Sequence, residues 1–136
     1  MNLVDTGPLI ALIDRGQQEA HRRCVEALKT LSGELLTTWT CFTEAMYFLY
    51  ELRGWSGQKA LWNFRERGAP LLHTTSSQEA DRMQTLIARY QNVPMDLADA
   101  SLVAAAESTG LRLVFTLDSD FRIYRDHGQN AFSIVP

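Results

Sequence analysis

Four acidic residues, far apart in the chain, occupy positions from which their carboxylates could share one cation. Asp5 directly follows the apolar run NLV, and Asp118 comes soon after the run LVFT. Glu44 and Asp99 stand inside segments that are otherwise largely apolar. Carboxylates brought together repel one another and take up protons unless a hard divalent cation such as Mg²⁺ or Mn²⁺ joins them. Such a metal can activate water and stabilise charge on a phosphate, so the sequence indicates metal-assisted hydrolysis of phosphodiester bonds.

Asp99 is the acid whose surroundings are hardest to explain otherwise. The segment 97–106 is apolar except for Asp99 and Ser101, and a helix that is apolar nearly all round is a buried one. A buried carboxylate is costly unless it is paired, hydrogen-bonded or bound to a metal. The alternative is that Asp99, one turn after an N-cap at Asp96, only satisfies the helix N-terminus and its dipole.

Glu44 has a comparable environment. It belongs to the sequence CFTEAMYFLYE, and its neighbours three and four residues further on are Tyr47 and Phe48. A glutamate on an aromatic helix face is uncommon and favours a functional role. The alternative is a first-turn acid that the helix dipole favours.

Asp5 and Asp118 follow segments that we expect to be strands. Ligand sites of parallel sheets form beyond the carboxyl ends of the strands, so both acids are placed at the productive edge. Each also has a structural alternative, because acids at strand ends often cap the next helix. Asp5 or Thr6 could cap one helix, and Asp118 or Ser119 another.

Short apolar runs alternate with longer helical patterns along the chain, without an internal repeat or a linker. This alternation predicts an α/β fold, a three-layer sandwich in which a small central parallel sheet is flanked by helices, in one domain over residues 1–136. The predicted strands are 2–4, 34–38, 71–74, 113–116 and 132–135. The predicted helices are 9–14, 17–31, 40–53, 58–67, 78–91, 97–109 and 119–124.

Bulk composition limits the class of protein. A hydrophobic share of 46% with 21% charged residues is typical of a folded domain rather than a disordered chain. No apolar run approaches the ~20 residues of a membrane helix, and no basic segment precedes the apolar N-terminus, so we expect a cytoplasmic protein. The net charge of −3 argues against binding nucleic acid through bulk positive charge. Clustered carboxylates would account for this acidity, and a bound cation would offset it.

The two cysteines do not form a recognisable zinc motif. Cys24 and Cys41 are too far apart for a CxxC pair, so we expect two reduced thiols. His21 and Cys24 have a helical spacing that could suit a metal, but no second pair accompanies them.

The ordered motifs resemble the PIN domain, and more narrowly the VapC-type toxins of toxin–antitoxin pairs. The resemblance spans nearly the whole chain and rests on VDTGPLIAL, TEAMYFL, MDLADASLVAAAE and VFTLDSDF. It implies that Asp5, Glu44, Asp99 and Asp118 are the metal-binding, catalytic acids. It also implies accessory residues around them: Thr6 and Thr116 as hydroxyls lining the site, Asp120 as an accessory acid, and Asp96 as either a further site acid or a helix cap.

The resemblance further implies an activity and partners. We expect an Mg²⁺- or Mn²⁺-dependent endoribonuclease with one or two metal ions, acting as the toxin of a type II pair. Family members are usually homodimers inhibited by a small antitoxin protein, which can place a basic side chain near the acids. No family motif covers the segment 55–68.

Two other functions stay open. One is a PIN-like binding protein that has lost catalysis and keeps its acids for structure. The other is a receiver-like phospho-acceptor module, which also has acids at strand ends. Receiver modules carry a lysine near a late strand, whereas the lysines here are Lys29 and Lys59.

Overall fold

A five-stranded parallel sheet forms the middle layer of the molecule, as the sequence predicted. The computed structural model describes all residues from 1 to 136. The strands of this sheet are β1 (Asn2–Val4), β2 (Leu35–Thr38), β3 (Leu71–His73), β4 (Leu113–Phe115) and β7 (Ser133–Val135). Their order across the sheet is β3-β2-β1-β4-β7, and every neighbouring pair is parallel.

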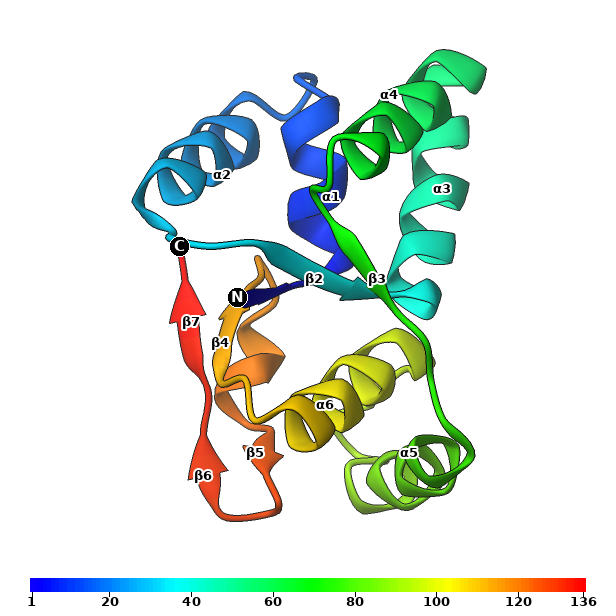
Figure 1. Cartoon of the computed structure of the whole chain (residues 1–136), viewed down its shortest axis with the longest axis vertical. Helices are drawn as coiled ribbons and strands as arrows, with labels where there is room; N and C mark the ends of the chain where they lie inside the picture. Colours follow the sequence, from blue (N-terminus) through cyan, green and yellow to red (C-terminus); the bar gives the residue numbers. More distant parts are fainter.

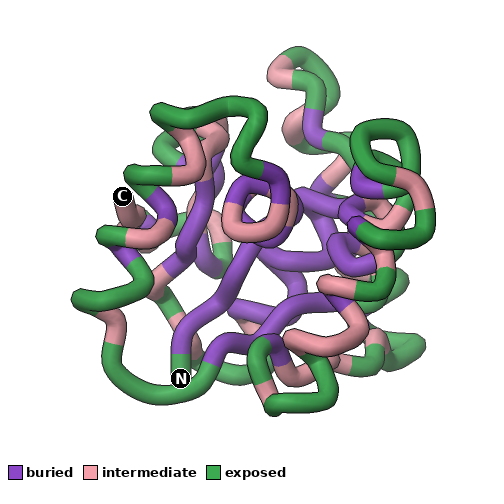
Figure 2. The backbone as a smooth tube through the Cα atoms, turned by 90° about the horizontal axis from the view of Figure 1, so that it is seen from above, coloured by how far each residue is buried: buried purple, intermediate pink, exposed green.

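Helices cover both faces of the sheet (Figure 1). Those on one face are α1 (Thr6–Ile13), α2 (Gln18–Thr30), α3 (Trp39–Arg53) and α4 (Trp55–Glu66). Those on the other are α5 (Ser77–Arg89) and α6 (Leu97–Thr109). Successive side chains of a strand point to opposite faces, so Leu3 and Val4 enter two separate hydrophobic cores. Figure 2 shows this buried interior inside an exposed shell of helices and turns.

α6 has the bounds predicted for it. Its residues from Ala98 to Ala106 are all buried, in agreement with a run that is apolar except for Asp99 and Ser101. The side chain of Asp96 caps its first turn by accepting a hydrogen bond from the Asp99 backbone N–H at 2.8 Å. Gly110 ends the helix in the left-handed conformation, which glycine adopts without steric cost.

Some element boundaries differ from those predicted. α1 begins at Thr6 instead of residue 9, because Asp5 caps it. α4 begins at Trp55 instead of residue 58, directly after Gly54, whose φ of 61° lets the chain reverse between two helices. The predicted helix at 119–124 is a shorter 3₁₀ helix, η1 (Ser119–Arg122). The antiparallel ribbon β5 (Arg125–Asp126) and β6 (Asn130–Ala131) was not predicted, since two-residue strands leave no periodic pattern.

The strand order creates a crevice between β1 and β4. The chain first proceeds from β1 outward through β2 to β3, and α5 and α6 then carry it back to the other side of β1. Ligands of open parallel sheets bind where the order reverses in this way, beyond the carboxyl ends of the strands. No helix combines the length and the hydropathy needed to cross a membrane.

Candidate metal centre

Three carboxylates from distant parts of the sequence converge at this crevice. Asp5 follows β1, Asp118 follows β4, and Asp99 stands in the first turn of α6. One carboxylate oxygen from each of them lies within 4.8 Å of the others. Such spacing allows a single cation to contact all three acids.

Hydrogen bonds hold Asp5 and Asp118 in place. The Asp5 carboxylate accepts from the Thr6 N–H at 2.8 Å and from the Thr116 hydroxyl at 2.7 Å. The same Thr116 hydroxyl accepts from the Asp118 N–H at 2.9 Å, while Asp118 accepts from the Asp120 N–H at 2.8 Å. Asp5 and Asp118 therefore each cap the following helix and still contribute an oxygen to the cluster. Capping a helix and binding a metal are thus compatible roles for these two acids.

Asp99 receives a partner that the sequence did not indicate. The hydroxyl of Tyr124 donates to Oδ2 of Asp99 at 2.8 Å in the buried interior. Tyr124 lies six residues after Asp118 in the mixed stretch SDFRIYRDH, where no local pattern assigns its side chain a partner. Only the folded arrangement brings the end of this segment back to α6.

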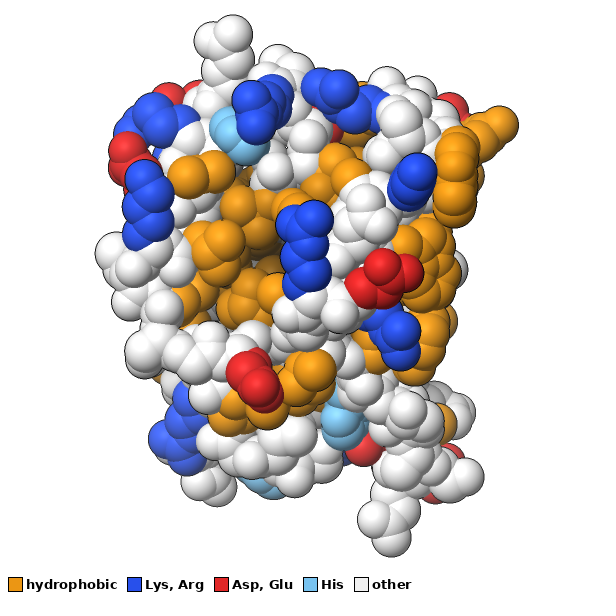
Figure 3. Space-filling model, turned by 45° about the horizontal axis from the view of Figure 1, so that its top comes forward, with side chains coloured by type: hydrophobic (Ala, Val, Ile, Leu, Met, Phe, Trp, Pro, Cys, Tyr) orange, Lys and Arg blue, Asp and Glu red, His pale blue; other side chains and the backbone are white.

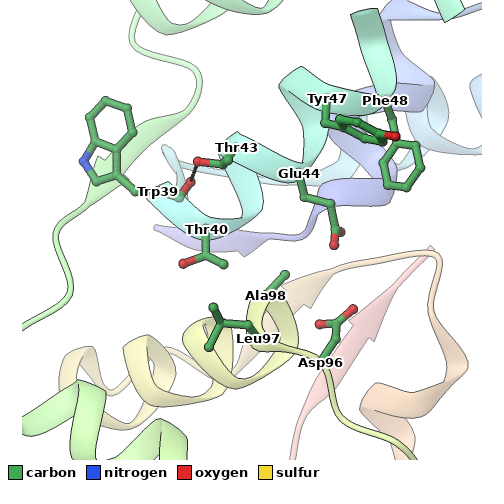
Figure 4. Close-up of a pocket in the computed structure, with 9 residues that line it drawn as sticks. All are labelled: Trp39, Thr40, Thr43, Glu44, Tyr47, Phe48, Asp96, Leu97 and Ala98. Atoms are coloured by element: carbon green, nitrogen blue, oxygen red, sulfur yellow. Dashed lines mark hydrogen bonds between the residues drawn. The ribbon is translucent and has the colours of Figure 1, made fainter. Parts of the chain in front are cut away.

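Glu44 and Asp96 line the same cavity, of about 310 Å³, as the three converging acids. Glu44 is not part of the group within 4.8 Å. Figure 4 shows Glu44 from α3 and Asp96 from the start of α6 pointing toward one another across the opening. They therefore border the centre formed by Asp5, Asp99 and Asp118, and a ligand that extends beyond a first cation would contact them.

The accessory residues occupy two environments. Thr6 and Thr116 are buried, and the Thr6 hydroxyl donates to the carbonyl of Cys41 at 3.3 Å. Asp120 is half-buried beside Asp118. The hydroxyls are thus used within the protein, whereas Asp120 keeps access to solvent.

The cluster is electrostatically unbalanced. Burial raises the pKa of Asp5 to about 6 and that of Asp99 to about 8, and repulsion from neighbouring acids adds to both shifts. Burial also raises the pKa of Glu44. No arginine, lysine or histidine forms an ion pair with these acids. The site therefore favours either protonation or a bound cation.

A hard divalent cation fits the available donors. The cavity presents carboxylate oxygens, the ligand type that Mg²⁺ and Mn²⁺ prefer. The nearest sulfur, that of Cys41, lies 3.9 Å from Asp5, and burial raises the pKa of this thiol to about 12. The thiol of Cys41 is therefore protonated at neutral pH in the metal-free protein, and the oxygen donors outnumber it at the cavity. No lysine lines the cavity, which disfavours the receiver-like alternative.

Other candidate ligand groups lack this character. Glu107, Asp126 and His127 also approach within 4.8 Å of one another. There, however, Arg82 pairs with Glu107 at 2.8 Å and Arg112 with Asp126 at 3.1 Å, so the acids are neutralised. The spacing of His21 and Cys24 creates no centre, because neither belongs to a group of potential ligands.

An apolar hollow of about 700 Å³ adjoins the acidic cavity and shares Glu44 and Asp96 with it. Aromatic side chains of α3 stand around it, as Figure 4 shows for Trp39, Tyr47 and Phe48. The acids thus open onto an aromatic surface, in agreement with the unusual neighbours of Glu44 in the sequence.

Comparisons with known proteins agree with this fold. The family model described as the PIN domain matches residues 3–126. Ribonuclease VapC26 of Mycobacterium tuberculosis is 24% identical over 135 residues, which cover 98% of this chain and 99% of that protein.

Two solved structures are similar in fold. The Mycobacterium tuberculosis toxin VapC20, described as cleaving the sarcin-ricin loop, has a TM-score of 0.81 at 16% identity, covering 88% of this chain and 92% of its own. A toxin–antitoxin complex from Klebsiella pneumoniae has a TM-score of 0.64 at 22% identity, covering 89% and 90%. The predicted fold class is thereby confirmed.

Proposed function

The chain belongs to the PIN domain family, and from this premise we propose that it is a divalent-metal-dependent endoribonuclease. Its substrate class is RNA, as the names of its ribonuclease relative and of the similar toxin structure suggest. The observation that carries the proposal is a cluster of three carboxylates within 4.8 Å that no basic side chain neutralises. Keeping such a cluster is costly for folding, which a metal-binding function explains.

In this proposal Asp5, Asp99 and Asp118 hold a Mg²⁺ or Mn²⁺ ion, and Glu44 extends the acidic surface toward a second ion or the substrate. The bound metal supplies Lewis acidity that activates water and offsets the charge of the phosphodiester. The Thr116 hydroxyl donates to the Asp5 carboxylate and accepts from the Asp118 N–H. It therefore holds two of the proposed ligands at a fixed separation. Asp96 and Asp120, at the edge of the centre, add negative charge that concentrates cations.

The expected products carry 5′-phosphate and 3′-hydroxyl ends. We also propose a cytoplasmic location, since cellular RNA would be the substrate. The rival within this family is a catalytically inactive PIN-like protein whose acids serve only the fold. The two differ in whether the protein binds a divalent cation and whether RNA is cut.

The direct test uses end-labelled RNA incubated with the purified protein in Mn²⁺ or in EDTA. We expect cleavage in Mn²⁺, none in EDTA, and a loss of at least about 100-fold in Asp5→Asn. The matched control is Asp81→Asn, which removes an exposed acid of α5 outside the cavity. Equal cleavage by Asp5→Asn and the unmodified protein would reject the assignment of Asp5, and absence of any cleavage would favour the inactive alternative.

We further propose that the protein is the toxin of a type II toxin–antitoxin pair and forms a homodimer. The similar Klebsiella structure is described as a toxin–antitoxin complex. The uncompensated negative charge at the site would attract a basic side chain of an antitoxin. Figure 3 shows hydrophobic side chains in a hollow bordered by Lys and Arg side chains, on the side that carries α1, α2 and α4. A partner protein could cover this surface.

Expression in a bacterial host tests the toxin proposal. The protein should slow growth, Asp5→Asn should not, and co-expression of the small protein encoded beside its gene should restore growth. Light scattering should give twice the mass of one chain. Normal growth with active, soluble protein present would contradict the toxin proposal and leave the ribonuclease proposal standing.

A further inference from the structure

Tyr124 is a fully buried residue whose hydroxyl points at the metal centre. Its ring packs edge-on against Tyr90 and Phe121, each with a centroid distance of 5.1 Å. Its hydroxyl donates to Oδ2 of Asp99 at 2.8 Å. Tyrosine hydroxyls inside a core normally find a partner, but this partner is one of the three converging carboxylates rather than a backbone group.

The contact joins two of those acids through one short segment. Asp118 caps η1 at its start, and Tyr124 closes the same turn through a backbone hydrogen bond to the carbonyl of Asp120 at 3.2 Å. From the far end of this turn the tyrosine side chain reaches back to Asp99 in α6. The separation of Asp118 from Asp99 is therefore tied to the Tyr124 hydroxyl.

The other Asp99 oxygen, Oδ1, accepts no hydrogen bond from the protein. With Oδ2 fixed, the carboxylate cannot rotate freely, and Oδ1 stays available to a cation. Partners that hold a ligand from behind in this way commonly contribute about 10- to 100-fold to metal affinity. A purely structural role for the hydroxyl would require no coupling to metal.

We propose that Tyr124 is a positioning residue of the metal centre, holding Asp99 oriented for a divalent cation. This inference rests on the proposed metal-dependent function. Tyr124 contacts neither metal nor substrate and acts through Asp99. Replacement with phenylalanine keeps the ring packing and removes only the hydroxyl.

The test compares Tyr124→Phe with Tyr90→Phe. Tyr90 belongs to the same aromatic cluster, and its hydroxyl accepts a hydrogen bond from the Arg125 N–H at 3.2 Å, away from the acids. Mn²⁺ binding is measured by calorimetry or by the loss of the free-ion electron spin resonance signal. RNA cleavage is measured separately as a function of Mn²⁺ concentration.

We expect the Kd for Mn²⁺ to rise about tenfold or more in Tyr124→Phe, and to stay unchanged in Tyr90→Phe. Cleavage by Tyr124→Phe should recover to within a few-fold at saturating Mn²⁺. In an Asp99→Asn background, Tyr124→Phe should weaken Mn²⁺ binding no further, because the oriented carboxylate is already absent.

Equal Mn²⁺ affinities of Tyr124→Phe, Tyr90→Phe and the unmodified protein would overturn the inference while leaving the ribonuclease proposal intact. Failure of the Tyr124→Phe protein to fold would also overturn the inference, because the hydroxyl would then be needed for the stability of the core. If the unmodified protein binds no Mn²⁺ and cuts no RNA, the proposed function fails and this inference fails with it.

Discussion

Replacement of Asp99 with asparagine should stabilise the metal-free protein while removing one of its proposed ligands. Asp99 is buried beside two other acids, and its carboxylate receives a hydrogen bond from Tyr124 but no ion pair. Asparagine has nearly the same shape and can still accept from the tyrosine hydroxyl. The substitution therefore removes the charge with little change in packing.

The size of the effect follows from the raised pKa of Asp99. Burial, with added repulsion from Asp96, Asp5 and Asp118, raises this pKa from 3.8 to about 8. Such a difference between the unfolded and folded chain corresponds to about 4 kcal/mol of lost stability at pH 7. Relaxation and water entry reduce this cost. We expect a net gain of about 2 kcal/mol.

The sign of the pH dependence is fixed by the direction of the shift. Because the folded pKa lies above the unfolded one, the folded protein holds a proton that the unfolded chain releases. The loss in free energy of unfolding that Asp99 causes is absent below about pH 4, grows as the pH rises, and levels off above about pH 8. The advantage of Asp99→Asn should follow the same course.

Urea denaturation in EDTA, repeated from about pH 4 to about pH 8, measures this course. Asp81→Asn serves as the control, because Asp81 is exposed on α5. Saturating Mn²⁺ should reverse the order, since metal stabilises the form that binds it. A gain that is the same at both ends of the pH range, or no gain at all, would refute the view of Asp99 as a strained, unneutralised acid.

Other features of the structure give further expectations. Thr116→Val removes the hydroxyl shared by two site acids and should lower the free energy of unfolding by about 1–3 kcal/mol in urea titrations, whereas Thr116→Ser should not. Although burial acts the other way, hydrogen bonds from Arg82 hold the pKa of Glu107 below 4.5. The stability that this ion pair contributes is lost as the pH falls through the folded pKa. In thermal melting, Glu107→Gln should therefore destabilise the protein by about 1 kcal/mol at pH 7 and by much less near pH 3. Burial raises the pKa of Cys24 to about 11 and of Cys41 to about 12, so both thiols should react with a chromogenic disulfide only after unfolding, and rapid reaction of the folded protein would contradict their placement.

Much of the fold was predictable because the signals for helices are local. α6 has the predicted bounds, since the cap at Asp96 and the stop at Gly110 each act on the adjacent turn of one continuous apolar run. The alternation of strands and helices also predicted the parallel sheet. The β5–β6 ribbon was missed, because its strands are too short for a pattern and form through contacts with the rest of the fold.

The composition of the candidate site was only partly predictable. The sequence pointed to acids at strand ends and to acids in apolar helices, and only in the helices is a carboxylate costly without a partner. Their relative distances were not predictable: Asp5, Asp99 and Asp118 meet within 4.8 Å, whereas Glu44 borders the cavity. These distances depend on the order of strands and the crossing of α6 over the sheet, which many sequences with the same local patterns could arrange differently.

Tyr124 shows most clearly what could not be predicted from the sequence. By itself the sequence determined only that Tyr124 ends a predicted short helix, within the mixed charged and apolar stretch SDFRIYRDH. Only the tertiary structure decided that its hydroxyl faces Asp99. Local patterns report which side chains avoid water, but the partner of a buried polar atom is selected by packing between segments distant in the chain.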